Sequence, residues 1–538
     1  MRVKMVNRAL GLLAASIAAI VAAWWWLGRP VAMPADAAAV DTLQCVSYAP
    51  FRPGQDPLEL GTHVTATQIE EDLRGLRVLT PCIRTYSTDH GVDQVPAIAQ
   101  RLGMKVMLGL WLNPEPAKNR VQIDTAVALA KRFPETVTTV IVGNEVMLRG
   151  DLSPVDLMAI IREVKAAVSC PVTYADVWEF WKRYPEIAGT VDFVTIHLLP
   201  YWEDFPIPAN RAAAHVEAIR TQIAGLFPGK EVMIGEVGWP SAGRMREGAL
   251  PSPANQARFL AEVMANARRA HYRVNVIEAF DQPWKRRLEG TVGGHWGLFD
   301  AYRRVAKFAW GASVSNHPGW RWQAAVGALL AIVCFAVAAA LARRRDTMPP
   351  PGRWVGIAAI TTVSGTLVGW ALANVPVESL GLGGWMEGLA WAAIALVSPV
   401  VAAASLVVDL PAPSFSHILG RRDERPRARL AFVAGAVQLA LTVLALQAAL
   451  MLVFDPRYVD FPFAPLLAGA GPFLLLSLAT AAQKGGRPAA ETLAAAVLAG
   501  AAIYIAINES VANWQAMLLT AGLLMLALSL ARLRVAPG

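Results

Sequence analysis

The sequence predicts an α/β fold, a (β/α)₈ TIM barrel, followed by an all-α bundle of transmembrane helices. Two observations carry this prediction. Short apolar runs rich in β-branched residues alternate with helical patterns between residues 45 and 280. From Trp322 onward the chain is mostly Ala, Leu, Val and Gly, which raises the mean hydropathy of the 538 residues to +0.39. A chain of this length exceeds what one core needs, so at least two structural units are expected.

Eight runs of the first half predict strands, because they are short, apolar and β-branched. They are Cys45–Phe51, Cys82–Tyr86, Lys105–Leu112, Thr138–Asn144, Val172–Val177, Phe193–Leu199, Glu231–Val237 and Asn275–Phe280. Helix-start signals lie between them: a capping box at Thr67-Gln-Ile-Glu70, and a serine before a proline at Ser153-Pro154 and Ser252-Pro253. Eight strands alternating with helices fit a barrel. A doubly wound open sheet is the alternative, but no G-x-G-x-x-G follows the first run.

Apolar runs of about 20 residues predict helices that cross a bilayer. One lies at about Leu10–Leu27, and seven follow near 323–342, 355–374, 386–408, 430–454, 463–482, 489–507 and 513–531. We therefore expect a signal anchor at residues 1–29, an extracytoplasmic barrel at 30–320 and a seven-helix transmembrane region at 321–538. The first segment can also be a cleaved signal peptide with a site at Ala35–Ala39, but Trp24–Trp26 form an interfacial aromatic anchor that favours an uncleaved one.

Basic residues predict the orientation of these spans. The loops assigned to the cytoplasm hold Arg343–Arg345, five arginines between Arg421 and Arg429, and Lys484 with Arg487. The opposite loops are acidic, with Arg457 as their only basic residue. The barrel is therefore predicted to face the periplasm or the outside of a multi-pass cell-membrane protein. The net charge of +8 then reflects the basic loops that orient the membrane spans, and nucleic-acid binding is not expected.

The chain has four cysteines. Cys45 and Cys82 begin two neighbouring predicted strands, so they can form a disulfide in an oxidising compartment or remain buried free thiols. No C-x-x-C or Cys/His spacing suggests a metal ligand set. We predict no metal and no cofactor.

A barrel places its chemistry at the carboxyl ends of its strands. The polar residues predicted at those ends are Tyr48, Tyr86, Asn144, Glu145, Tyr201, Glu236, Trp239, Glu278 and Asp281. Aromatic rings stack on the apolar faces of sugar rings, while amides and carboxylates bond to the hydroxyls. The sequence therefore predicts a sugar-binding rim.

Glu145 ends the fourth predicted strand and Glu236 the seventh, so both carboxylates can point into one cleft. Two carboxylates about 5 Å apart allow a double displacement with retention, whereas about 6.5–9.5 Å leaves room for a water and inversion. An acid/base needs a raised pKa, which the field of an ionised partner can supply. Asn144 can donate to the sugar 2-hydroxyl, an interaction that tightens in the transition state.

These motifs resemble those of glycoside hydrolase family 17, the β-1,3-glucanase family. The similar segments, in the family's order, are Val46-Ser-Tyr-Ala-Pro-Phe51, Ile83-Arg-Thr-Tyr-Ser87, Val142-Gly-Asn-Glu-Val146, Ile234-Gly-Glu-Val-Gly-Trp-Pro-Ser241, Glu278-Ala-Phe-Asp-Gln-Pro-Trp-Lys285 and His295-Trp-Gly-Leu-Phe299. The resemblance implies that Glu145 is the acid/base and Glu236 the nucleophile. Gln282 departs from the glutamate of many relatives, and His197-Leu-Leu-Pro-Tyr-Trp202 is only loosely similar to the family's sixth-strand segment.

A barrel joined to a multi-span tail also resembles bacterial inner-membrane proteins of β-(1→3)/(1→6)-glucan synthesis. The resemblance implies a β-glucan substrate, transfer as well as hydrolysis, and a glucan synthase as a partner. A non-catalytic glucan-binding or export scaffold is the alternative. A nucleotide-sugar synthase is disfavoured, because the chain contains no Asp-x-Asp and no Gln-x-x-Arg-Trp.

Four further predictions concern single residues and the tail. Lys285 can orient a hydroxyl or tune Glu278, and Trp296 can be a stacking platform, like Trp239. Arg84 is expected to form a buried pair with a carboxylate rather than to contact substrate. The tail has almost no ionisable residues at mid-depth, which favours a passive anchor or partner-binding bundle over a glucan conduit.

Overall fold

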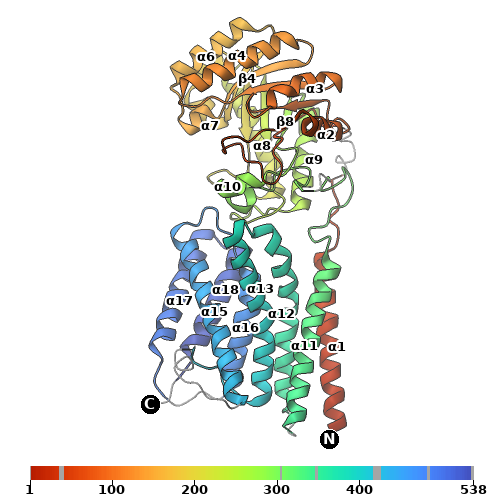
Figure 1. The fold of residues 1–538 in the computed structure, drawn as a ribbon, viewed down its shortest axis with the longest axis vertical. Coiled ribbons are helices and arrows are strands. Elements are labelled where there is room, and N and C mark those ends of the chain that lie inside the picture. Colours follow the sequence, from red (N-terminus) through yellow and green to blue (C-terminus); the bar gives the residue numbers. More distant parts are fainter. Residues whose placement is uncertain are drawn as a thin grey trace. The chain divides into compact units, whose positions relative to one another are not determined.

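The computed structural model of the chain describes residues 2–34, 42–302, 306–345, 349–415, 426–480 and 485–534 (Figure 1). The chain divides into two compact units. The barrel unit comprises Val31–Ala242 and Gly248–Val314, and the helical unit comprises Met1–Pro30, Gly243–Glu247 and Ser315–Gly538. The predicted cleavage site at Ala35–Ala39 lies outside the described residues, as do Arg421, Arg422, Arg425 and Lys484 of the predicted cytoplasmic loops.

The barrel unit is built on a closed barrel of parallel strands that run in the order β1 to β8, with β8 pairing back onto β1. The strands are β1 (Cys45–Ser47), β2 (Cys82–Arg84), β3 (Lys105–Leu110), β4 (Val137–Asn144), β5 (Val172–Val177), β6 (Val194–Leu198), β7 (Val232–Val237) and β8 (Val274–Val276). The predicted TIM barrel is confirmed. Several predicted strands run a few residues too far, because apolar residues such as Phe51 continue past the last ladder hydrogen bond into the rim loops.

Helices connect successive strands of the barrel. They are α2 (Ala66–Leu76), η2 (Val92–Gln94), α3 (Val95–Arg101), α4 (Pro116–Arg132), α5 (Val146–Arg149), α6 (Pro154–Ala167), α7 (Trp178–Arg183), η3 (Pro185–Gly189), α8 (Ala209–Leu226), α9 (Pro253–Ala270), η4 (Pro283–Lys285) and α10 (Arg286–Gly293). Ser153 and Ser252 cap α6 and α9 as predicted, each accepting a hydrogen bond from the third backbone N–H after it. The cap of α2 is Thr65 rather than Thr67, so that prediction was two residues late.

A disulfide joins Cys45 of β1 to Cys82 of β2, across a sequence separation of 37. It resolves the alternatives that the sequence left open for these two cysteines. The bond links the first two strands at their amino ends, the end of the barrel opposite to the predicted sugar-binding rim.

The helical unit contains α1 and seven helices that follow the barrel. They are α1 (Arg2–Leu27), α11 (Trp320–Arg344), α12 (Pro351–Glu378), α13 (Gly381–Val408), α15 (Pro426–Phe454), α16 (Phe463–Ala479), α17 (Ala489–Glu509) and α18 (Trp514–Ala531). Seven helices of the described residues are long and apolar enough to cross a membrane. The eighth, α16, has 17 residues and contains Pro472.

The helix α1 packs on α11 and α12. Ile20 and Trp24 of α1 are fully buried against Ala324 and Ala331 of α11. Small residues allow the close approach of α1, since a Cβ atom on Gly365 of α12 would lie 2.6 Å from Ile20 Cδ1. The first and second predicted spans are therefore neighbours.

Candidate active site

Glu145 lies at the carboxyl end of β4 in a backbone conformation that non-glycine residues rarely adopt. Its φ and ψ are 53° and 36°, the left-handed region, and it precedes the short helix α5. Its N–H donates to the carbonyl of Ala175 in β5 at 2.8 Å, which fixes the turn. Such strain persists where the surroundings hold it, and it occurs often at functional sites.

Glu236 lies in β7, and its side chain is 5% exposed. The ladder pairs it with His197 of β6, because the register shifts by one residue just before this pair. A Cβ atom on the preceding Gly235 would lie 2.4 Å from Thr195 Cγ2. A side chain at position 235 would therefore clash with Thr195, which explains the glycine before Glu236.

Strands β4, β6 and β7 bring Glu145, His197 and Glu236 together. One ligand atom from each lies within 4.8 Å of those of the other two. The Nδ1 atom of His197 is 2.8 Å from Glu145 Oε1, and its Nε2 atom is 3.6 Å from Glu236 Oε1. An oxygen of each carboxylate thus lies within 4.8 Å of one of the other, which is close to the separation of about 5–5.5 Å in retaining glycosidases and well short of the roughly 6.5–9.5 Å in inverting ones.

Arg84 of β2 holds this cluster from the barrel interior. It is 1% exposed, and its Nη1 donates to Glu236 Oε1 at 3.2 Å and to the carbonyl of Gly235 at 2.8 Å. Its Nη2 donates to Asn144 Oδ1 at 2.6 Å. The buried carboxylate pair expected for Arg84 is present. Because Arg84 occupies the amide oxygen, the group that Asn144 can offer a ligand is its N–H.

The pKa of Glu145 lies below its ordinary value, although the sequence analysis expected the reverse for an acid/base. Burial is the largest influence on this pKa and raises it. The hydrogen bond and charge of His197, with the more distant guanidiniums of Arg149 and Arg84, outweigh burial and lower the pKa. The contact of His197 with Glu145 was not predicted from the sequence, and it is this contact that lowers the pKa of Glu145.

Asp176 of β5 lies behind Glu145 in a buried position. It accepts hydrogen bonds from the Tyr174 hydroxyl and, at 3.1 Å, from the N–H of Met147. Burial raises the pKa of Asp176 to about 6, opposed by the Tyr174 hydrogen bond and supported by the charge of Glu145. Tyr174 and Asp176 thus hold the first turn of α5, directly after Glu145.

Glu278 and Lys285 form a buried pair on the β8 side of the site. Lys285 Nζ lies 2.8 Å from Glu278 Oε2, and the Glu278 side chain is 2% exposed. Burial raises the pKa of Glu278 to about 7, with Lys285 opposing the shift and Glu236 adding to it. Lys285 is thus in contact with Glu278, and its role in tuning that carboxyl or in orienting a substrate hydroxyl stays a prediction.

Four aromatic residues predicted to bind substrate are buried in the structure. Tyr48 donates to Asp72 at 3.1 Å, Trp239 donates to the carbonyl of Leu250 at 3.0 Å, and Tyr201 is fully enclosed. Trp296 is 3% exposed and stacks on Trp202 with ring centroids 6.2 Å apart. In this structure these rings support the rim rather than line an open wall, so their contact with substrate stays a prediction.

Tyr86 and Trp111 are rim aromatics that keep exposed surface. Tyr86 is partly exposed, and its hydroxyl donates to Ser47 Oγ at 2.8 Å. Burial and the charge of Glu236 raise the pKa of Tyr86 well above its ordinary value. Trp111 follows β3, is 36% exposed and stacks under the Arg149 guanidinium, 4.2 Å from its ring centroid. Trp111 was not predicted as a site residue, because the apolar run Lys105–Leu112 placed it inside a strand, whereas β3 ends at Leu110.

The cluster of two glutamates and a histidine also has the donor types of a metal site. Arg84 Nη1 lies 3.2 Å from Glu236 Oε1 and 3.4 Å from His197 Nε2, so a permanent cation already occupies the side from which these two atoms would bind a metal. Repulsion between that guanidinium and a divalent ion disfavours metal binding.

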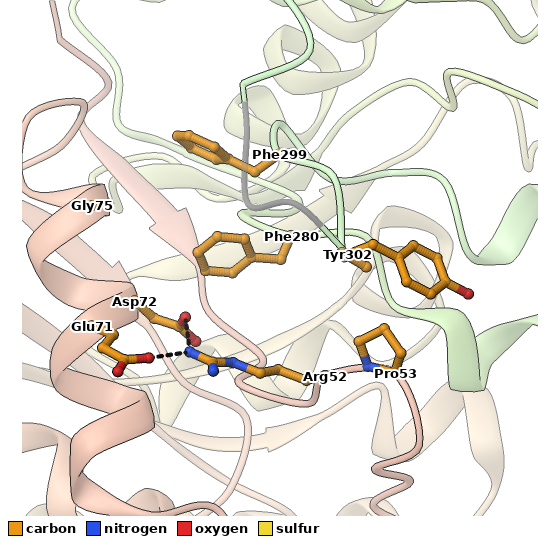
Figure 2. A pocket seen from close by; sticks show the side chains of 9 residues that line it. Arg52, Pro53, Glu71, Asp72, Gly75, Phe280, Phe299 and Tyr302 are labelled. Carbon is orange, nitrogen blue, oxygen red and sulfur yellow. Dashed lines mark hydrogen bonds and ion pairs between the residues drawn. The ribbon is translucent and has the colours of Figure 1, made fainter.

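A cavity of about 370 Å³ lies elsewhere in the barrel unit (Figure 2). Figure 2 shows Arg52 pointing to Glu71 and Asp72 of α2, at 2.9 and 3.1 Å, with Phe280, Phe299 and Tyr302 on the other side. Its lining residues do not include the carboxylates that β4 and β7 contribute. The cavity is therefore separate from the Glu145–Glu236 cluster.

Residues 45–297 match the family model described as BtgE/BtgC glycoside hydrolase domain. The chain is similar to the glucan 1,3-beta-glucosidase of Arthroderma benhamiae, at 27% identity over 44% of this chain and 82% of the relative. It is 24% identical to the glucan 1,3-beta-glucosidase of Saccharomyces cerevisiae, over 44% of this chain and 83% of the relative. It spans only 40% of the probable beta-glucosidase btgE of Neosartorya fischeri, at 24% identity over 41% of this chain.

Among solved structures, the chain is similar to an active-site mutant of the Rhizomucor miehei beta-1,3-glucanosyltransferase in complex with laminaritriose. The identity is 26%, the alignment covers 51% of this chain and 98% of that one, and the TM-score is 0.45. The matched segment contains all eight strands of the barrel and both rim glutamates. Residues 45–297, which hold the whole barrel, are thus similar to the BtgE/BtgC glycoside hydrolase domain.

Proposed function

We propose that the barrel is a retaining β-glucan-active glycosidase or transglycosidase that acts on β-1,3-glucan. The observation that carries the proposal is the pair Glu145 and Glu236, whose carboxylate oxygens lie within 4.8 Å at the rim of the barrel. That separation suits direct attack by one carboxylate while the other serves the leaving group. The names of the Arthroderma and Saccharomyces relatives support glucan as the substrate class.

Glu236 is the nucleophile in this proposal. Arg84 Nη1 donates to its Oε1 at 3.2 Å, and this contact favours the ionised carboxylate that attack requires. The attacking oxygen forms a glycosyl ester as the glycosidic bond breaks. The Asn144 N–H, held in place by Arg84, donates to the sugar 2-hydroxyl as positive charge develops on the ring.

Glu145 is the acid/base, and it works together with His197. His197 Nδ1 lies 2.8 Å from Glu145 Oε1, so the imidazole is in hydrogen-bond contact with the carboxyl group. Glu145 donates a proton to the leaving oxygen, and the ionised Glu145 then takes a proton from the incoming hydroxyl. A water at that step gives hydrolysis, and a sugar hydroxyl gives transfer.

We further propose that the chain is anchored in a bacterial inner membrane with the barrel outside the cytoplasm, where it takes part in β-(1→3)/(1→6)-glucan synthesis or remodelling. Seven helices of the described residues have the length and composition of membrane spans. The arginine-rich loops and the Cys45–Cys82 disulfide favour an extracytoplasmic barrel, because disulfides persist in oxidising compartments. A glucan synthase is the partner that this setting suggests.

The test uses the full chain in detergent with a reduced β-1,3-gluco-oligosaccharide as donor. Products longer than the donor mean transfer, and new β-(1→6) bonds tie the enzyme to glucan assembly. Products that are only shorter mean hydrolysis. Proton NMR of the first turnovers must find the β-anomer, since an α-anomer would rule out the double displacement.

Matched variants separate catalysis from scaffolding. Glu236→Gln should abolish turnover, while Glu247→Gln, a substitution outside the proposed catalytic cluster, should leave it unchanged. Full activity in both Glu145→Gln and Glu236→Gln would overturn the enzymatic proposal and favour the non-catalytic glucan-binding or export scaffold.

A further inference from the structure

A cavity of about 220 Å³ lies inside the helical unit, apart from the barrel chemistry. It is formed by the carboxyl ends of α12 and α15 and the amino ends of α13 and α16. These ends adjoin the loops that lack the arginine clusters, the side proposed to be extracytoplasmic.

Two buried polar groups in the cavity wall have no hydrogen-bond partner among the described residues. They are the Ser379 hydroxyl and the Trp391 indole N–H, in residues that are 6% and 5% exposed. Both residues line the cavity. An unsatisfied buried polar group is costly and uncommon, so a ligand that completes two of them at once has a physical basis.

Carboxylates stand beside these groups in the same wall. Glu378, Glu387 and Asp460 line the cavity, and Asn374 Nδ2 donates to Glu378 Oε1 at 2.6 Å. The wall thus combines an indole, a hydroxyl, an amide and carboxylates. Such a mixture of aromatic and hydrogen-bonding groups is the chemistry that recognises sugars.

The chemistry of the wall excludes other ligand classes. An ammonium group offers only donors, so it leaves the Trp391 N–H without an acceptor. A phosphate offers acceptors but meets the Glu387 carboxylate, which repels it. A sugar hydroxyl both donates and accepts, so it can bond to the Trp391 indole N–H and to the Ser379 hydroxyl together.

We propose that this cavity binds one glucosyl residue of a β-glucan chain. Its volume is smaller than the roughly 300–1,000 Å³ of sites for drug-sized ligands, which suits a single ring better than an oligosaccharide. The choice of a glucan over the sugar of a glycolipid rests on the proposed function, since the barrel of the same chain acts on that polymer. The helical unit then retains a glucan end as well as anchoring the enzyme.

Photolabelling of the full chain tests this site. A laminaritriose probe with a diazirine at its reducing end is added to the Glu236→Gln chain, which binds the probe without cleaving it. After irradiation and digestion, we expect label on barrel peptides and on peptides that contain residues 374–392 or 459–465. Excess laminaritriose should remove the label from both regions, whereas excess glucosyl diacylglycerol should not displace it.

Matched tryptophan variants of the Glu236→Gln chain test whether the labelling depends on the Trp391 N–H. Trp391→Phe keeps a ring but removes the N–H, so it should lower labelling of the helical unit about fivefold, the effect of one hydrogen bond. Trp385→Phe changes an exposed tryptophan of the same helix that does not line the cavity, and it should change nothing. Ser379→Ala should act like Trp391→Phe, and gel filtration checks that each variant is folded.

The outcomes separate this site from the proposed function. Label confined to the barrel overturns the helical site and leaves the glucan-active barrel standing. Label in neither unit overturns both. Label in the helical unit that only the glycolipid displaces, or that responds equally to Trp391→Phe and Trp385→Phe, also overturns the site.

Discussion

Glu145 and Glu236 can be tested one atom at a time, because glutamine keeps the shape of the side chain and removes its acid–base chemistry. We expect Glu145→Gln to lower kcat by about 10²–10⁴-fold on unactivated glucan, the usual contribution of a positioned acid/base. Glu236→Ala should lose activity and regain part of it with azide, which replaces the nucleophile. The initial rate with and without azide is the measurement, and equal rescue of Glu145→Ala and Glu236→Ala with the same anomeric product would contradict the assignment of roles.

His197 should govern the pH dependence of the reaction. Because His197 lowers the pKa of Glu145, His197→Gln should raise that pKa. A general acid with a higher pKa keeps its proton to a higher pH, so the alkaline limb of kcat/KM should move upward. The control is His271→Asn, an exposed position with φ of 53° that asparagine tolerates. If the alkaline limb of His197→Gln does not move, His197 does not lower the pKa of Glu145.

Glu278 should make the barrel less stable as pH rises. Its pKa of about 7 in the folded state lies above the ordinary 4.5, so the folded chain binds more protons between these values. The free energy of unfolding therefore falls as pH rises from about 4.5 to 7 and levels off above that window. Other buried acids also contribute to this pH dependence, so the measurement is the difference in melting temperature between Glu278→Gln and the parent chain. This difference should grow as the pH rises from about 4.5 to 7. A difference that stays constant would contradict the contribution of Glu278.

The sequence predicted some of the residues at the site and could not predict others. Glu145 and Glu236 stand at strand ends after β-branched runs, which sequence patterns report well. His197 could not be assigned in the same way, because its contact with both glutamates depends on a register shift just before it in β6 and β7. The burial of Tyr201 and Trp239 is likewise a packing outcome, since their sequence signal is the same for an exposed platform and a core ring.

At the scale of elements, the Cys45–Cys82 disulfide should stabilise the amino end of the barrel. It closes a loop of 37 residues between β1 and β2. Cys45→Ser with Cys82→Ser should lower the melting temperature of the barrel by roughly 5–10 °C, from a typical loss of about 2–4 kcal/mol. Cys170→Ser, a free and half-buried thiol, is the control. An equal effect from the control would contradict a specific role of the bond.

The eight strands were predictable because each is a short buried run between helix-start signals. Their carboxyl ends were predicted less well, since the apolar run Cys45–Phe51 continues beyond β1, which ends at Ser47. The helices of the tail were predicted by length and composition alone. The shorter α16 was predicted as a full span because the apolar run extends beyond Ala479, where the helix ends.

For the whole molecule, the arginine distribution predicts where each terminus lies. Eight crossings would return the carboxyl end to the side where the chain began. We expect a green fluorescent protein fused after Gly538 to fluoresce, and external protease to digest the barrel in intact spheroplasts while the fusion survives. A protected barrel in sealed spheroplasts would contradict the orientation.

The barrel is held by the rest of the chain at both of its ends. Val31 and Val314 form an antiparallel bridge within the barrel unit, with N–H to carbonyl distances of 2.8 and 3.0 Å. The helices that lead to them, α1 and α11, pack on one another in the helical unit. Two connections therefore tether the barrel unit to the helical unit. Proteolytic cleavage of one connection leaves the barrel attached, and its release requires cleavage of both. Since its two ends meet, a different module with neighbouring termini could replace it without rearranging the helical unit.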